Sequence, residues 1–212
     1  MKYIFSRWLI AALLWAIVNH SSLSANSDSV TIRVHFLHGS KPRFKFRHEE
    51  DRWFGGILGG HAGVEYAPGK IVNFLPHGRF HIFTQSHHIN SHFSIHDTVS
   101  FYEILGSDAD SVKKTIVCIR VSSQQKAELD TLVAAYRRRS PYDYAFFGMR
   151  CGAAAYDLLA GAGIIERHSF SGTWSRFFYP RKTRRYLEKL ALRNGYNIQK
   201  RQGSHRRTWE KD

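Results

Sequence analysis

Acidic residues and cysteine are scarce in this sequence of 212 residues. Asp and Glu number 17 against 31 Lys and Arg, and the formal net charge of +14 predicts an anionic partner. The two cysteines exclude a disulfide-rich scaffold and allow at most one disulfide bond. The Cys-x-x-Cys and His-Glu-x-x-His spacings of common zinc sites are also missing. No internal repeat is found, so one globular domain is expected.

Long apolar runs are missing too, apart from one near the N-terminus. Lys2 and Arg7 precede the apolar residues Trp8 to Val18, and small residues follow as far as Ala25, which is the order of a secretory signal peptide. The run is shorter than the roughly 20 residues of a membrane-spanning helix. We therefore predict a signal peptide at 1–25, a periplasmic or secreted protein, and no transmembrane span in the mature chain. An uncleaved anchor is the alternative.

Residues 26–175 are expected to form one domain of the α+β class. Apolar residues from Val30 to Phe36 alternate with polar ones, as in a strand with one buried face. The Pro68-Gly69 pair is typical of a turn between two strands. An antiparallel sheet of five or six strands is predicted, with strands at 30–36, 61–66, 70–75, 80–84, 100–105 and 115–121.

Three helices are predicted along the same stretch and beyond it. Ser122 and Gln125 have the spacing of a capping box and precede apolar residues at helical spacing. The second helix is predicted to begin at Cys151, where small residues allow it to be buried. The third begins after Pro180 and ends at Gly195, a residue type common after a helix.

Residues 176–212 are predicted to form a basic C-terminal extension, partly helical, that packs on the domain. From Arg176 to Arg207, eleven Lys and Arg residues stand against Glu188 alone. Such a run is either a solvated helix face or a surface for anionic polymers or lipids. The candidate residues for binding substrate or anions are Arg150, Arg181, Lys182, Arg184 and Arg185.

Cys151 and His61 are the residues best suited to carry chemistry. A cysteine in the first turn of a helix feels the positive end of the helix dipole, which lowers the pKa of its thiol. A histidine beside such a cysteine can act as its base. His61 also follows a segment whose glycines predict a close approach of the backbone, namely Gly55, Gly56, Gly59 and Gly60.

Three segments together resemble a known family. They are Gly60-His61-Ala62-Gly63-Val64-Glu65-Tyr66, then Lys70-Ile71-Val72-Asn73 after a turn, and later Arg150-Cys151 at the start of a helix. A histidine strand ahead of a cysteine helix resembles the circularly permuted papain-like hydrolases. That group includes permuted NlpC-type endopeptidases, lecithin:retinol acyltransferase-like enzymes and the YaeF/YiiX group. Many members carry Asn where this chain has Arg150.

The resemblance implies a permuted papain-like fold, no cofactor, and a third residue, Asn73, that orients His61. A two-residue turn would place Asn73 on the opposite face of the sheet from His61. A three-residue loop or a bulge would bring it to the same face. With a loop at 67–69, Asn73 pairs with Gly63 and becomes a diagonal neighbour of His61, and we expect this register. Glu65, on the His61 face, and His77 are the alternatives for the third residue.

These residues predict acyl transfer at a cell-envelope substrate, either a wall peptide or a lipid. Cys151 would attack an amide or ester carbonyl, and His61 would pass the thiol proton to the leaving group. Backbone N–H groups near Cys151 would bind the oxyanion. The prediction is an exported thiol hydrolase or acyltransferase with an anionic envelope partner and no nucleic-acid partner.

Two alternatives stay open. Cys118 and Cys151 could form a disulfide bond in a non-catalytic envelope-binding protein whose basic tail binds anions. A histidine-rich polar stretch could instead bind zinc or copper, although no metal-site spacing is found and no metal is predicted. Its members are His77, His81, His87, His88, His92 and His96.

Overall fold

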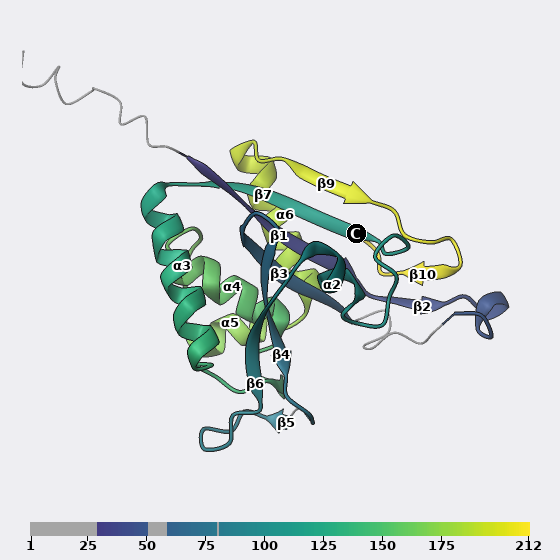
Figure 1. Cartoon of the computed structure of the whole chain (residues 1–212), viewed down its shortest axis with the longest axis horizontal. Coiled ribbons are helices and arrows are strands. Elements are labelled where there is room, and N and C mark those ends of the chain that lie inside the picture. Colours follow the sequence, from purple (N-terminus) through teal and green to yellow (C-terminus); the bar gives the residue numbers. More distant parts are fainter. Residues whose placement is uncertain (1–28, 51–58, 80) are drawn as a thin grey trace, which may run out of the picture.

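The centre of the fold is a six-stranded antiparallel sheet (Figure 1). The computed structural model describes residues 29–50, 59–79 and 81–212, so the signal peptide predicted at 1–25 lies outside the described residues. The strand order is β6-β4-β3-β1-β7-β9. The strands are β1 (Val30–His38), β3 (Gly60–Ala67), β4 (Lys70–Pro76), β6 (Ser91–His96), β7 (Lys114–Val121) and β9 (Ile198–Arg201).

Two small two-stranded sheets lie at separate ends of the molecule (Figure 1). Strand β2 (Ser40–Pro42) pairs antiparallel with β10 (Arg207–Trp209), beside the short 3-10 helix η1 (Phe44–Phe46). Strand β5 (His81–Phe83) pairs in parallel with β8 (Ala145–Phe147).

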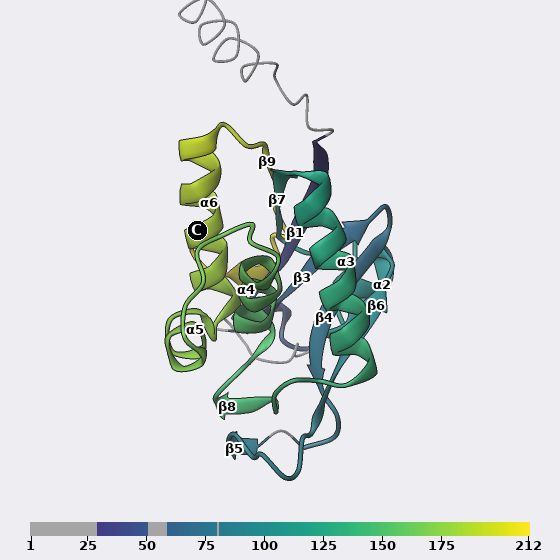
Figure 2. The ribbon, with the colours of Figure 1, turned by 90° about the vertical axis from the view of Figure 1, so that its left-hand side faces the viewer.

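Helices cover both faces of the large sheet. Figure 2 shows α4 and α6 on one side of the sheet and α2 on the other. Helix α3 contributes Leu129 and Val133 to the core that α4 covers. The large core forms between the first face and its helices, and Val34, Val64 and Ala154 belong to it. A smaller core, with Leu37 and Phe101, lies under α2. The helices are α2 (Thr98–Glu103), α3 (Ser123–Arg138), α4 (Cys151–Gly161), α5 (Phe170–Phe177) and α6 (Pro180–Asn194).

Most predicted elements are present, and the predicted capping box at Ser122 and Gln125 is confirmed at the start of α3. The strand predicted at 100–105 is wrong, because these residues belong largely to α2. Asp97 caps this helix by accepting a hydrogen bond from the backbone N–H of Ser100. Strand β6, which was not predicted, takes the edge position next to β4.

The C-terminal residues are part of the same sheet and core. Strand β9 pairs antiparallel with β7, and Leu187 and Ala191 of α6 are buried in the large core. None of the helices in the described part of the chain has the length and apolar character of a membrane span.

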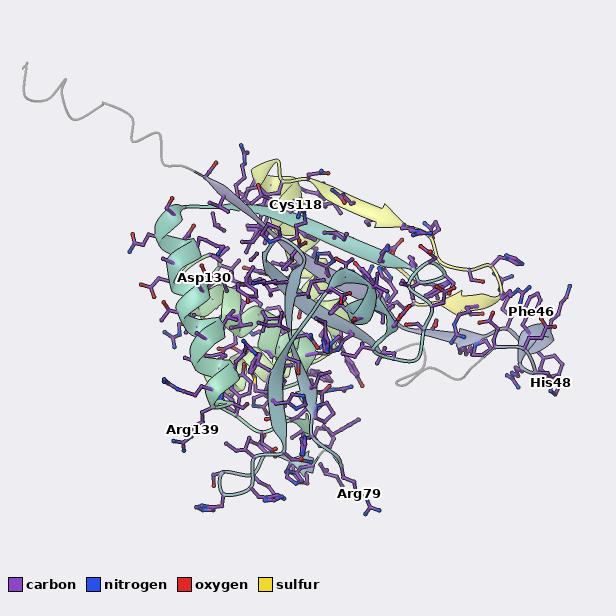
Figure 3. All side chains as sticks on the ribbon, viewed as in Figure 1. Phe46, His48, Arg79, Cys118, Asp130 and Arg139 are labelled. Atoms are coloured by element: carbon purple, nitrogen blue, oxygen red, sulfur yellow. The ribbon has the colours of Figure 1, made fainter. Side chains whose placement is uncertain are left out.

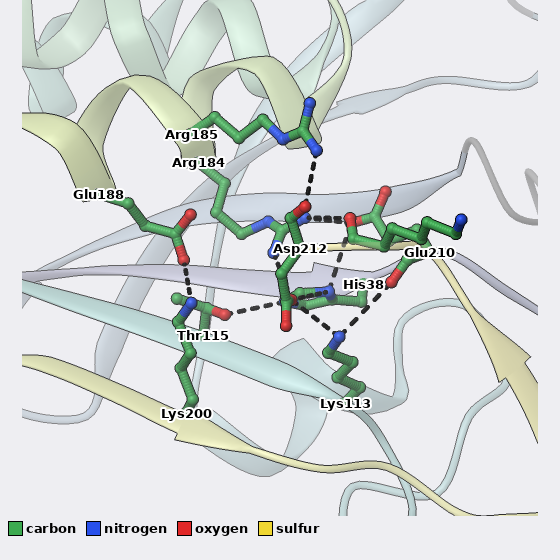
Figure 4. A network of polar contacts seen from close by, with 10 residues as sticks. His38, Lys113, Thr115, Arg184, Arg185, Glu188, Lys200, Glu210 and Asp212 are labelled. Carbon is green, nitrogen blue, oxygen red and sulfur yellow. Dashed lines mark hydrogen bonds and ion pairs between the residues drawn. The ribbon is translucent and has the colours of Figure 1, made fainter.

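A buried ionic cluster ties the last residues to β1, β7 and α6 (Figure 4). Arg184 is fully buried and lies 3.2 Å from Glu210 and 3.0 Å from Asp212. Lys113 lies 2.8 Å from Asp212. Burial raises the pKa of Glu210 to about 7. Burial, with the charges of Arg184 and Lys113, lowers the pKa of His38 to about 3.

Candidate functional site

Cys151 is the first residue of α4 and is almost completely buried. The helix start is held against the segment that leads into α6. A Cβ atom at Gly152 would lie 2.7 Å from the carbonyl oxygen of Phe177 and 2.9 Å from the nitrogen of Pro180. The hydroxyl of Thr183 donates to the carbonyl of Gly152 at 3.0 Å. Helix α6 therefore fixes the position of the cysteine helix.

His61 approaches the thiol from β3. Gly60 before it has a φ of +87°, and a Cβ atom there would lie 2.4 Å from the carbonyl oxygen of Leu37. The predicted close backbone approach is therefore confirmed at this glycine. The His61 ring centroid lies 5.4 Å from that of Phe101 in α2. A hydrogen bond joins His61 to the thiol of Cys151.

The register of β3 and β4 confirms the predicted pairing of Asn73 with Gly63, but the three-residue loop is wrong: Ala67 pairs with Lys70 across a two-residue turn, and a bulge in β3 produces the register. Asn73 pairs with Gly63, and the register shifts between Glu65 and Ala67. Oδ1 of Asn73 lies 3.0 Å from Nε2 of His61. The structure thus brings Cys151, His61 and Asn73 together in one hydrogen-bonded series.

Two backbone carbonyls set the orientation of the Asn73 amide. Its Nδ2 lies 3.3 Å from the oxygen of Ser94 and 3.4 Å from that of Ile71, and both oxygens can only accept. Nδ2 also lies 2.8 Å from Nδ1 of His96, which is then an acceptor. Oδ1 therefore accepts from Nε2–H of His61. This tautomer leaves Nδ1 of His61 to take the thiol proton.

The electrostatics of the pair favour separated charges. Burial would raise the pKa of the Cys151 thiol, but His61, the Arg150 guanidinium and the N–H of Ala62 bring it below its ordinary value. Burial would likewise lower the pKa of His61, but Cys151 and the hydrogen bond that His61 donates to Asn73 raise it overall. Both shifts favour a thiolate beside an imidazolium.

Tyr144 and Arg150 complete the surroundings of the thiol. The Tyr144 hydroxyl is hydrogen-bonded to both Cys151 and Arg150, and burial raises its pKa, so it remains a donor at neutral pH. The Arg150 guanidinium lies 5.5 Å from the ring centroid of Phe146 and 5.0 Å from that of Tyr179. Its Nη1 is buried and has no hydrogen-bond partner among the described residues.

The sequence pattern predicts Cys151 and His61 but not two of their neighbours, Tyr144 and His96. Tyr144 has no motif of its own and comes to the thiol through an isolated bridge with Met149. His96 reaches Asn73 from β6, a strand that was not predicted. The pairing of β4 with β6 places His96 near Asn73, so His96 could be identified only if β6 had first been predicted as a strand.

The alternative third residues have other partners. Glu65 lies 2.8 Å from Nε2 of His35 and 3.2 Å from Arg33. The ring centroid of His77 lies 5.8 Å from that of His92. Of the candidates for the third residue, Asn73 is the one whose side chain contacts His61.

The disulfide alternative is wrong, because both cysteines are free. Val117 and Ile119 of β7 point into the large core, so Cys118 between them points to the opposite face of the sheet from α4. Figure 3 shows Cys118 on β7, where its sulfur lies 3.9 Å from Nε2 of Gln199.

The histidine-rich stretch is organised by a carboxylate. Within the described ranges, no three His, Cys, Asp or Glu side chains are grouped as a metal site would require. Nδ1 of His81 lies 2.5 Å from Oδ2 of Asp143. Asp143 also accepts from the backbone N–H groups of Gln85 and Asn90, and so holds the loop after β5.

The candidate anion-binding residues are not equivalent. Arg150 lies at the thiol. Arg184 is fully buried and bound to two carboxylates, so its assignment to a solvent-facing anion site is corrected. Of the others on α6, Arg181 is half-buried, Lys182 is exposed, and Arg185 donates to the carbonyl of Asp212.

Comparison of the sequence with models of protein families finds no match, and comparison with curated proteins finds none. In structure, the chain is similar to the type VI secretion system effector TseH, with a TM-score of 0.44 and 13% sequence identity. The alignment covers 88% of this chain and 100% of that chain.

Proposed function

We propose that this chain is an exported thiol hydrolase or acyltransferase of the permuted papain-like type, acting on an amide or ester bond of a cell-envelope substrate. Cys151 is the nucleophile, His61 its base, and Asn73 the residue that orients His61. The observation that carries the proposal is the hydrogen-bonded series from the Cys151 thiol through His61 to the Asn73 amide. Export rests on the N-terminal sequence pattern, 1–25.

The first half of the reaction follows from the tautomer of His61. Nδ1 of His61 holds the proton of the thiol, and the thiolate Sγ of Cys151 forms a bond to the substrate carbonyl carbon as the carbonyl π electrons move to the oxygen. The tetrahedral intermediate then expels an amine or alcohol, which takes the proton from Nδ1. An acyl-thioester on Cys151 and a neutral His61 remain.

The second half regenerates the thiolate and the imidazolium. Nδ1 of His61 takes a proton from water or from an acceptor alcohol or amine, whose heteroatom attacks the thioester carbonyl. The bond from carbon to Sγ breaks, and the thiolate leaves. Water gives hydrolysis, and another nucleophile gives acyl transfer.

Two kinds of hydrogen-bond donor near the thiol are available to the oxyanion. The first intrahelical bond of α4 runs from the N–H of Ala154 to the carbonyl of Arg150, so the N–H groups at 151–153 precede it. Among described side chains, none caps this helix start. These N–H groups and the Tyr144 hydroxyl would bind the negative oxygen.

Arg150 would recognise an anionic group of the substrate close to the scissile bond. Its guanidinium is held by two aromatic rings, and its Nη1 lacks a hydrogen-bond partner in the described part of the chain. A carboxylate or phosphate oxygen would satisfy this buried donor. The bound anion would then lie beside the nucleophile.

The test is alkylation of Cys151 by iodoacetamide across pH, in the full chain and in its Cys151→Ser, His61→Ala and Cys118→Ser variants. The expected apparent pKa of Cys151 lies well below the ordinary thiol value of about 8.5 and rises in His61→Ala. Cys118→Ser is the matched control and leaves the profile unchanged. Ordinary thiol reactivity that is indifferent to His61 would instead indicate a non-catalytic binding protein.

A further inference from the structure

Large apolar side chains are exposed together at the end of the molecule built by β5, β8 and their neighbouring loops. Phe83 is 68% exposed, Ile82 63% and Phe147 50%. The ring centroids of Phe83 and Phe147 are 5.6 Å apart, and those of Phe146 and Phe147 are 4.9 Å apart. We name as the apolar tip the exposed residues Ile82, Phe83, Ile89, Phe146, Phe147 and Phe170.

The apolar tip continues into a groove. Ile89 and Phe170 line a hollow of about 780 Å³ with Tyr142 and with Arg139 at the end of α3. Other exposed large apolar residues, such as Phe44 and Leu192, lie on η1 and α6. A contiguous apolar surface of this kind marks an interaction site in a folded protein.

The exposed charges of this end are mainly positive. In the segments that build it, 74–96 and 131–156, Asp143 is the sole acidic residue, and it is fully buried against His81. Asp157 also lies beside the groove, but it is half-buried and accepts from the hydroxyls of Tyr136 and Tyr142, which line the groove. Figure 3 shows Arg79 and Arg139 on either side of β5. The basic residues of these segments are Arg79, Arg137, Arg138, Arg139 and Arg150.

We propose that the apolar tip docks on the surface of an anionic phospholipid bilayer, with Ile82, Phe83 and Phe147 entering the acyl boundary and the arginines contacting lipid phosphates. Exposed apolar side chains rimmed by Arg combine hydrocarbon burial with attraction to anionic lipid. The basic α6 face is not needed for this docking.

Two other occupants fit these residues less well. Phe and Ile side chains carry no hydrogen-bonding groups, and a glycan polymer requires such groups beside its stacking surfaces. A second copy of the chain would bring the arginines of one tip against those of the other, because a two-fold contact uses the same patch twice. Neither objection applies to a bilayer of anionic lipid.

The tip lies beside the candidate active site. The Phe146 ring is in contact with the guanidinium of Arg150, which directly precedes Cys151 in the chain. A docked tip would therefore bring the thiol close to the lipid headgroups. Docking itself does not depend on the thiol, so the Cys151→Ser variant binds as the unmodified chain does.

The test is flotation of the full chain with vesicles of phosphatidylcholine alone or mixed with phosphatidylglycerol. Phe83→Ser combined with Phe147→Ser should lower partition at least about tenfold. Arg79→Gln combined with Arg139→Gln should lower it by about tenfold or more on the anionic vesicles alone. Matched controls are Phe44→Ser for the apolar change and Lys189→Gln with Arg193→Gln for the charge change; both should bind as the unmodified chain does.

All these variants retain residues 1–28. A second measurement therefore distinguishes vesicle binding by the apolar tip from vesicle binding by that segment. Tryptophan emission added by Phe83→Trp should be quenched by lipids brominated in the acyl chains, whereas that added by Phe44→Trp should not. Equal quenching at the two positions would overturn the proposal. Self-association that Phe83→Ser with Phe147→Ser abolishes, without vesicle binding, would overturn it in favour of a second copy.

Discussion

Nε2 of His61 lies 3.0 Å from Oδ1 of Asn73, and the other end of that amide donates to carbonyls of β4 and β6. The histidine is thus oriented by an uncharged group whose own orientation is set by the sheet. Because the amide adds no negative charge, the positive charge of the imidazolium is balanced chiefly by the Cys151 thiolate. The pair is therefore expected to gain and lose its charges together.

Replacement of Asn73 by alanine should weaken the thiolate of Cys151. The variant loses the hydrogen bond to Nε2 of His61, and a bond of about 1 kcal/mol corresponds to a roughly fivefold to tenfold slower alkylation at neutral pH. Asn197→Ala, at an exposed position, is the control. An unchanged pH profile in Asn73→Ala would remove Asn73 from the site.

Both cysteines should react as free thiols when the protein is unfolded without a reducing agent and treated with a thiol reagent. Cys118 and the helix that carries Cys151 lie on opposite faces of the sheet, so a bond between the sulfurs would require the fold to open. The Cys118→Ser variant should unfold at the same temperature as the unmodified chain. A count of no free thiols before reduction would contradict this arrangement.

Gly152→Ala should destabilise the protein and lower the reactivity of Cys151. The added Cβ meets the backbone of the segment between α5 and α6, and such overpacking costs about 1–3 kcal/mol. Gly161→Ala, at the other end of α4, is the matched control, because its Cβ meets the flexible Leu132 side chain. Thermal unfolding of both variants measures the difference, and equal stability would mean that the close approach at Gly152 is unimportant.

The buried cluster of Figure 4 predicts a pH-dependent stability. The pKa of His38 is about 3 in the folded state and 6.5 without the fold, so the unfolded chain binds more protons between these values. The stabilisation is therefore lost as pH falls from 6.5 towards 3. In the same cluster the pKa of Glu210 is raised from 4.5 to about 7, which lowers stability as pH rises through that window.

Replacing His38 isolates its contribution. The difference in unfolding free energy between the unmodified chain and His38→Gln should grow with pH between about 3 and 6.5, by on the order of 5 kcal/mol, and then stay level. Thr115→Val, which removes the partner 2.8 Å from Nε2 of His38 without removing a titrating group, should show a difference independent of pH. Denaturant titrations at several pH values provide the measurement.

Much of the site could be predicted because its signals are local. A cysteine before a run of small residues predicts a buried helix start, and the Pro68-Gly69 turn leaves few registers for Asn73. The capping box at Ser122 likewise lies within one turn of its helix. These features depend on neighbours in sequence, so they can be deduced without the rest of the fold.

The elements that were predicted wrongly or not at all depend on contacts between distant parts of the chain. Aromatic residues at 101 and 102 favour a strand on propensity, but a cap at Asp97 and burial of both rings under the sheet produce a helix. Strand β9 has one half-buried residue, Ile198, and otherwise exposed polar ones, so it carries no alternating pattern. Its strand state comes from pairing with β7, which sequence periodicity does not reveal.

The hydrogen bond from the Thr183 hydroxyl to the carbonyl of Gly152 implies an order of events during synthesis. The histidine strand is made first, then the cysteine helix, and finally the segment that holds the helix start. Strands β2 and β10, joined by Ser40 and Arg207, are 167 residues apart, so closure of the fold waits for nearly the whole chain. A chain still being synthesised would therefore carry an ordinary thiol, and its reactivity would arise only after the last segment has docked.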